Sequence, residues 1–343
     1  MFGPFIYNCE HSIEVYETTK STLQDSELAD RIGRLAWAYH STGDLIPHTA
    51  ESLWSGHFFP WAESWNELQI AVTLAFFGMY KQAMVSLRMG FELGLLSVYW
   101  NLFDDGHEVI QEWIRSKEET PRFGEIWDRL KRHPNFEWFQ DRMDLRARLL
   151  ALGDLHNYVH SRGARFSNTM GLLKTNYQTY EEELLQRWGD TFEEVIRVLA
   201  IAHLIKYPIG TIRYDYSSKL GIDTPMFGGL NESEVDRLEE ILGQPTFFIL
   251  QELANRDEHT QSLIAGIMSL PDMTDQEVDE QIVDFDKLEI ENMGVSAWLK
   301  MQNQLMEGFE DPGLLAKWKS RNQRLAEWGS EMGYDKPAWQ RGS

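Results

Sequence analysis

The sequence predicts an all-α protein: a helical bundle followed by a further helical region. From about residue 26 onward, apolar residues recur at intervals of three and four, as at Leu28, Ile32 and Leu35, which is the period of an amphipathic helix. No long alternation of apolar and polar residues, the pattern of a strand, occurs in that part of the sequence. Capping boxes, which mark helix starts, occur at Thr191 with Glu194, Asn231 with Glu234, and Thr274 with Glu277.

The N-terminal residues differ from the rest and are predicted to form an arm. Segments 5–7 and 13–16 are short and rich in β-branched and aromatic residues, which strands favour. Residues 1–25 are therefore expected to form a short β-hairpin or an extended arm.

The central region is predicted to hold a series of helices bounded by proline and glycine. The helix over 80–103 is apolar on nearly all sides, as expected for the centre of a bundle. Gly153 is expected to bend or interrupt the last helix of the series, and residues 163–178 are typical of a loop. The predicted helices span residues 61–79, 80–103, 108–117, 123–132 and 136–161.

The domain organisation follows from breaks later in the sequence. Pro208 is expected to interrupt or end the helix before it, and the glycine-rich segment 221–229 is typical of a linker. We therefore predict a bundle domain of residues 26–225 and an acidic helical C-terminal region of residues 226–343. That C-terminal region holds 23 Asp and Glu against 10 Lys and Arg, a net charge of −13.

Composition and charge exclude several classes of function. The formal net charge of −22 opposes adhesion to nucleic acids or anionic lipids, because such binding draws on Lys and Arg. The longest apolar stretch, residues 68–80, is shorter than the roughly 20 residues of a membrane span. The single Cys9 rules out an internal disulfide and fits a reducing compartment, so a cytoplasmic protein without a membrane span is expected.

The first candidate motif lies in the helix predicted over 80–103. Arg88 and Glu92 are four residues apart, so their side chains share a helix face and can pair directly. In one interpretation Arg88 binds an anion or phosphate, and Glu92 orients the Arg88 side chain. In the other, the two residues form a satisfied ion pair that fixes the register of the helix.

The second motif contains two histidines with the same spacing. His156 and His160 lie four residues apart, but no glutamate follows the first as in a zinc protease and no cysteine pair is present, so neither a metal nor another cofactor is expected. His160 suits acid–base catalysis because imidazole titrates near neutral pH, with Asn157 or Glu92 as its orienting group. The alternative is a hydrogen-bonded histidine that packs against aromatic residues.

If the two predicted helices are neighbours, their polar residues meet in an apolar interior, where a polar cluster indicates function. The candidate catalytic residues are then His160, Arg88, Glu92 and Asn157. The candidate substrate-binding residues are His156, Arg162 and Arg165. The two arginines follow the one mildly basic stretch, residues 115–148, which has nine Lys and Arg against seven Asp and Glu.

The order of these pieces resembles a known family. The segments Tyr80–Ala83, Leu87–Glu92 and Leu155–His160 are similar to those of bacterial HEPN-like proteins (higher eukaryotes and prokaryotes nucleotide-binding domain), over about residues 60–165. The resemblance implies a small helical bundle, often a homodimer. Many members are metal-independent RNases of toxin or antiphage systems, and others are inactive binding or assembly modules.

Active HEPN members carry an arginine four to six residues before the catalytic histidine, and this sequence departs from that motif. The resemblance carries the catalytic histidine onto His160 but assigns no arginine. Arg88 or Arg162 can substitute only if the fold brings one of them within reach. Arg197 and His203 have the required spacing, but a valine follows the arginine in an apolar helix, which indicates a chance match.

Three functional hypotheses follow. The leading one is a HEPN-like protein that acts on RNA or a nucleotide in bacterial defence or toxicity, as a metal-independent endoribonuclease using His160. Its rival is a non-catalytic interaction or scaffold protein with a degenerate HEPN-like bundle, whose acidic C-terminal region binds a protein partner. The third is a small-molecule enzyme, which requires a cavity lined by the two motifs.

Overall fold

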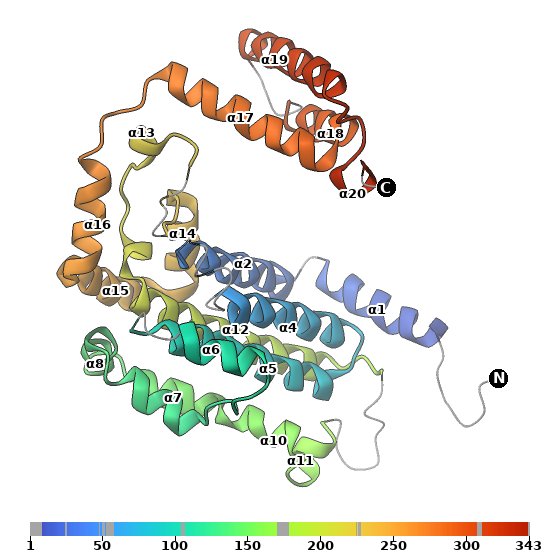
Figure 1. The fold of residues 1–343 in the computed structure, drawn as a ribbon. Helices are drawn as coiled ribbons and strands as arrows, with labels where there is room; N and C mark the ends of the chain where they lie inside the picture. The colour runs from blue at the N-terminus through green and yellow to red at the C-terminus, as the bar shows by residue number, and fades with distance from the viewer. Residues whose placement is uncertain are drawn as a thin grey trace. The chain divides into compact units, whose positions relative to one another are not determined.

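A computed structural model of the chain describes residues 9–24, 26–47, 49, 52, 58–103, 107–169, 178–223, 225, 228–306 and 311–341. Among these residues the regular structure is helical and no strand occurs, so the predicted all-α class is confirmed. The α-helices, labelled as in Figure 1, are α1 (Cys9–Leu23), α2 (Glu27–Ser41), α4 (Phe58–Phe76), α5 (Tyr80–Asn101), α6 (His107–Ile114), α7 (Phe123–Leu130), α8 (Pro134–Gln140), α9 (Leu145–Ala151), α10 (Leu155–Val159), α11 (Gly163–Ser167), α12 (Glu182–Lys206), α13 (Ser217–Leu220), α14 (Glu232–Leu242), α15 (Gln244–Arg256), α16 (Glu258–Met268), α17 (Asp275–Met293), α18 (Val295–Met306), α19 (Pro312–Glu331) and α20 (Ala338–Arg341). Short 3-10 helices are η1 (Thr42–Leu45), η2 (Leu152–Asp154) and η3 (Pro208–Thr211).

The N-terminal segment corrects the prediction of a hairpin or extended arm. Residues 13–16 lie inside α1, and residues 5–7 lie outside the described residues. The spacing of the buried residues Val15, Thr19 and Leu23 explains the helix, because positions four apart share one helix face. This four-residue pattern of buried residues along α1 outweighs the local β-propensity of residues 13–16.

Helix α5 is the central helix of the bundle, as its apolar surface predicts. It forms a hairpin with α4 and also packs against α12, which in turn packs on α2; these helices run together in Figure 1. Close approach is possible because α5 carries a glycine at the contact. A Cβ at Gly94 would lie 2.7 Å from a methyl carbon of Leu199 and 2.9 Å from the hydroxyl oxygen of Tyr39.

A buried hydrogen-bond chain ties three helices of this core together. The Tyr39 hydroxyl on α2 lies 2.7 Å from the Ser64 hydroxyl on α4. Ser64 donates to the backbone carbonyl of Gly90 on α5 at 2.6 Å. All three polar groups are thus satisfied inside the core, which a buried polar group needs in order not to destabilise the fold.

The single helix predicted over 136–161 is broken into pieces. Helix α8 ends at Gln140, α9 starts at Leu145, and η2 separates α9 from α10. The restart at α9 has a local cause, since the Asp144 carboxylate accepts a hydrogen bond from the backbone N–H of Ala147 at 3.1 Å and so caps the new helix. Gly153, expected to bend or interrupt the helix, lies within η2.

Two of the three predicted capping boxes are confirmed. Asn231 with Glu234 opens α14, and Thr274 with Glu277 opens α17. The third prediction is wrong, because Thr191 lies inside α12, where its hydroxyl donates to the carbonyl of Arg187 at 2.8 Å. A threonine can bond to the preceding turn in this way, so the sequence pattern alone did not fix the helix start.

The described residues form two compact units whose boundary differs from the predicted one. Unit 1 comprises Met1–Tyr214 and Thr224–Gly266, and unit 2 comprises Asp215–Asp223 and Ile267–Ser343. Helices α14 and α15, which the sequence placed in the C-terminal region, belong to unit 1, since α14 packs on α2 and α15 packs on η3 and α8. Their buried residues complete the core of the bundle: Val235, Leu238, Phe247 and Leu250.

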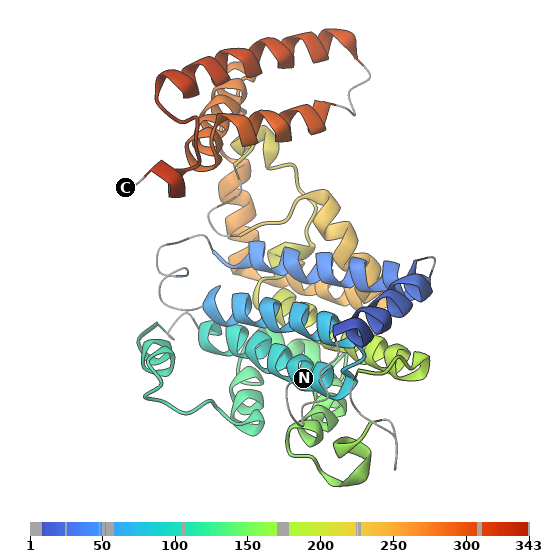
Figure 2. The ribbon, with the colours of Figure 1, turned by 90° about the vertical axis from the view of Figure 1, so that its right-hand side faces the viewer.

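Unit 2 is built from α17, α18 and α19, which pack against one another and are visible together in Figure 2. Trp298 fills its small core, together with Ile290 and Leu325. The same core contains a buried ion pair, in which a carboxylate oxygen of Asp286 lies 2.8 Å from an Arg321 guanidinium nitrogen. Unit 2 therefore has few apolar residues and one buried charge pair at its centre.

Candidate functional site

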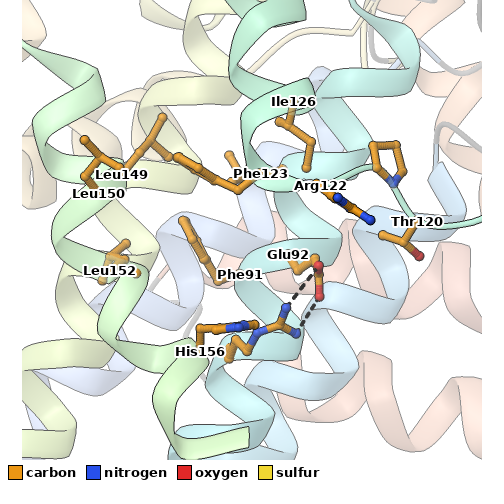
Figure 3. Close-up of a pocket in the computed structure, with 14 residues that line it drawn as sticks. Phe91, Glu92, Thr120, Arg122, Phe123, Ile126, Leu149, Leu150, Leu152 and His156 are labelled. Atoms are coloured by element: carbon orange, nitrogen blue, oxygen red, sulfur yellow. Dashed lines mark hydrogen bonds and ion pairs between the residues drawn. The ribbon is translucent and has the colours of Figure 1, made fainter. Parts of the chain in front are cut away.

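A pocket of about 510 Å³ opens in unit 1 between α5, the start of α7 and the segment from α9 to α10. Figure 3 shows Thr120, Arg122 and Glu92 on one side of the view and Leu149, Leu150 and Leu152 on the other. Helix α5 lines the pocket with Arg88, Phe91, Glu92 and Leu95. Residues at these spacings share one helix face, so a single face of the central helix forms one wall.

Arg88 and Glu92 form the ion pair that their spacing predicts. The two guanidinium nitrogens of Arg88 lie 2.6 and 3.2 Å from the two carboxylate oxygens of Glu92. The side chains are 24% and 31% exposed, so the pair is partly desolvated and faces the pocket. This forked geometry fixes both side chains more firmly than a single contact does.

Arg122 is the second guanidinium of the pocket. It immediately precedes α7, and its backbone N–H donates to the Glu125 carboxylate at 2.6 Å, which holds the start of the helix. Its side chain is exposed and makes no ion pair with another described residue. Unlike Arg88, Arg122 therefore has no carboxylate at ion-pair distance from its guanidinium among the described residues, although Glu118, Glu119 and Glu125 line an adjacent hollow with it.

The opposite wall of the pocket is apolar. Ile126, Leu149 and Leu152 are almost completely buried, whereas Phe123 and Leu150 are partly exposed at its mouth. Phe91 lies among these residues in Figure 3. The pocket thus combines an apolar body with a small polar end, the usual composition of a small-molecule site.

His156 brings the second motif to the pocket, which confirms that the two motifs are neighbours. Partial desolvation lowers the pKa of His156 below its usual value, and the positive charges of Arg88 and Arg162 and the neighbouring His160 act in the same direction. Only Glu92 acts to raise that pKa. The lowered pKa favours the neutral form of this exposed histidine, and its surroundings carry more positive than negative charge.

The other predicted site residues lie outside the pocket. The Asn157 amide donates to Asp154 at 3.0 Å, which gives it a local role at the start of α10. His160 directly follows α10 and is exposed, with its ring centroid 4.2 Å from that of His156. Arg162 is exposed, and Arg165 is exposed and lies over the Phe166 ring at 5.1 Å.

Arg197 and His203, the pair with the spacing of the HEPN motif, make structural contacts inside the bundle. Arg197 donates to the Ile241 carbonyl at 2.6 Å and pairs with Glu193 at 2.7 Å. His203 is 1% exposed, and its ring packs edge-on against Tyr39. Both residues join α12 to neighbouring helices inside the bundle, in keeping with a chance match to the motif.

Sequence reasoning missed Arg122, Thr120 and Phe123. Arg122 lies in the mildly basic stretch 115–148, which was the one available signal, but its residue type and spacing match no motif. Among the described residues, no group of three or more His, Cys, Asp or Glu side chains is arranged to hold a metal ion. None of the described helices has the length and apolar character that crossing a membrane requires.

Comparison of the chain with family models, curated protein sequences and solved structures gave no match.

Proposed function

We propose that the pocket of unit 1 binds a small organic anion with an apolar or aromatic body. The observation that carries this proposal is the convergence of Arg88, Arg122 and His156 on one pocket whose remaining walls are apolar. A volume of about 510 Å³ suits a small molecule. The third hypothesis from the sequence, a small-molecule site, required a cavity lined by both motifs, and the pocket meets that requirement.

The charges around the pocket support an anionic ligand. Glu92 pairs with two guanidinium nitrogens of Arg88, Arg122 has no such partner among the described residues, and the lowered pKa of His156 favours its neutral form. One carboxylate or phosphate group on the ligand complements this arrangement. Phe91 and Phe123 also line the pocket, and a flat aromatic body can stack on such rings. A nucleotide, expected from the sequence, is one member of this ligand class.

Replacing Arg122 with glutamine is expected to weaken the binding of an anionic aromatic ligand by about 10- to 150-fold. A hydrogen bond to a charged group contributes about 1.5–3 kcal/mol, and about 1.4 kcal/mol corresponds to a factor of ten in affinity. Isothermal titration calorimetry with benzoate, phenyl phosphate, AMP and neutral benzyl alcohol measures the loss. The same series separates a carboxylate ligand from a phosphate ligand.

Arg165→Gln is the matched control for this experiment. Arg165 is exposed and lies outside the pocket, so its replacement removes the same charge from the protein without touching the site. Affinities within twofold of wild type are expected for this variant. The proposal fails if benzyl alcohol binds as tightly as the anions, or if Arg122→Gln binds them as tightly as wild type.

A metal-independent endoribonuclease, as the HEPN resemblance implies, is a second candidate function. The exposure of His160 outside the pocket favours it, because an exposed imidazole is accessible to a polymer. Cations surround this surface: Lys81 donates to the Ser161 hydroxyl at 3.2 Å, and Arg162 follows in the chain. Under this proposal His160 moves the proton and a neighbouring cation stabilises the phosphoryl transition state.

His160→Ala is expected to reduce cleavage of labelled single-stranded RNA, measured in EDTA, by at least about 100-fold. Its melting temperature should stay at the wild-type value, since the replaced side chain is exposed. Arg122→Gln should cleave normally, which separates this activity from the pocket. Cleavage by His160→Ala at the wild-type rate, or none by wild type, counts against the endoribonuclease. A homodimer and a role in bacterial defence or toxicity stay predictions.

A further inference from the structure

Helix α17 of unit 2 exposes two large apolar side chains. Its core face carries Ile290 and the partly buried Val283, which pack into the centre of the unit. Phe285 and Leu288 lie off that face, and each is 54% exposed. They are three residues apart, so they are neighbours on the helix surface. We call them the Phe285–Leu288 face.

The rest of the surface of α17 is strongly acidic. The helix contains eight Asp and Glu residues and one Lys, namely Asp275, Glu277, Asp279, Glu280, Asp284, Asp286, Glu289, Glu291 and Lys287. Three of the carboxylates have cationic partners, because Asp286 pairs with Arg321, Asp284 with Lys287, and Asp279 with Lys317. The other five make no ion pair with a described residue. An uncovered apolar face thus lies next to uncompensated negative charge.

The end of α17 adds to this imbalance. Its last five residues include Glu289 and Glu291, and its last turn contains no basic residue. The carbonyl end of a helix carries a partial negative charge, so carboxylates there are disfavoured and cations are favoured. A positively charged partner near Glu289 and Glu291 would therefore interact favourably with the side chains and with the helix end.

We propose that the Phe285–Leu288 face docks a basic amphipathic helix of a partner protein. The apolar residues of such a helix cover Phe285 and Leu288, and its Lys and Arg side chains pair with the surrounding carboxylates. A second copy of this chain fits the face poorly, because a symmetric contact brings two acidic helices together. This binding surface is independent of the pocket in unit 1.

The test uses the full chain and a fluorescein-labelled peptide of about 18 residues, which is five helical turns. The peptide contains only leucine and lysine, with the leucines at i, i+3, i+4 and i+7 so that they form one face. Fluorescence anisotropy gives its affinity. Phe285→Ser/Leu288→Ser is expected to bind at least about tenfold more weakly, the equivalent of about 1.4 kcal/mol. Glu289→Gln/Glu291→Gln is expected to bind about threefold more weakly at low salt, since exposed ion pairs are weak.

Two controls make the outcome specific. Leu305→Ser removes an equally exposed leucine from α18 and should leave the affinity unchanged. A peptide of the same composition, with its leucines scattered around the helix, should bind at least tenfold more weakly than the amphipathic one. Equal binding of both peptides, or wild-type binding by Phe285→Ser/Leu288→Ser, overturns the proposal. So does sedimentation velocity that shows a dimer of the wild type and a monomer of Phe285→Ser/Leu288→Ser.

Discussion

Replacing Arg321 with leucine is expected to lower the free energy of unfolding of unit 2 by about 3–5 kcal/mol. Arg321 is 15% exposed at its side chain and pairs with Asp286, whose side chain is 5% exposed. Removing the guanidinium leaves a buried carboxylate without a compensating charge, which costs more than the pair itself contributes. Trp298 and Gln302 donate to the same carboxylate at 3.2 and 3.4 Å, and these neutral donors replace only part of the lost stabilisation.

The effect is measured by hydrogen–deuterium exchange in peptides from α17 to α19, because two units in one chain can unfold separately. Arg324→Leu, at an exposed position of the same helix, is the matched control and should change stability by less than about 0.5 kcal/mol. The double variant Asp286→Leu/Arg321→Leu should be more stable than Arg321→Leu, because it removes the stranded charge. A double variant less stable than the single one contradicts this explanation.

Acidification from pH 6.5 to pH 4 is expected to destabilise unit 1 by up to about 3 kcal/mol through His203. Burial lowers the pKa of His203 from 6.5 to about 4, although a hydrogen bond to the Leu199 carbonyl acts to raise it. Its Nδ1 donates to that carbonyl at 2.8 Å, and its Nε2 has no hydrogen-bond partner among the described residues. In the unfolded chain His203 is protonated below about pH 6.5, whereas in the folded chain it stays neutral until about pH 4. Its contribution to the free energy of unfolding is therefore fully present above pH 6.5 and is lost as the pH falls to about 4.

His203→Leu should remove most of this pH dependence, whereas His259→Leu, at an exposed position, should leave it in place. Exchange rates of α12 peptides at pH 6.5 and pH 4.5, corrected for the intrinsic effect of pH, provide the measurement. Asp286 in unit 2 should give the opposite pH dependence to His203 and so serves as a comparison within the same protein. Burial raises its pKa, with Arg321 and Trp298 opposing, so its contribution to stability is present at low pH and lost as pH rises through the folded-state pKa. Equal destabilisation of α12 in wild type and His203→Leu is the result that rejects the role of His203.

Local features of the fold could be predicted from the sequence, because their physics is local. The apolar surface of α5 and the four-residue spacing of Arg88 and Glu92 depend only on helix geometry, and both predictions are confirmed. The capping box at Thr274 is local in the same sense. Thr191 matched the same pattern without starting a helix, because its hydroxyl bonds to the turn before it instead.

The composition of the pocket could not be predicted, because it depends on where helices end and what they meet. His160 was favoured over His156, but α10 ends at Val159, and of the two only His156 lines the pocket. Arg122 belongs to the site only because the start of α7 faces α5, which no pattern near residue 122 reveals. The division of the structure into units differs from the predicted boundary for the same reason, since the assignment of α14 to unit 1 follows from its packing on α2.

The glycine contact on α5 has a consequence for how quickly and selectively a ligand can bind. Gly94 lets α5 approach Leu199 and Tyr39 to distances that leave no room for a methyl group unless their side chains shift, and close packing of this kind restrains the helix. Arg88, less than two turns away on the same helix, is held by its two contacts with Glu92 before any ligand arrives. A pre-organised wall of this kind spares the entropy of ordering on association and favours rigid ligands that match its shape over flexible ones.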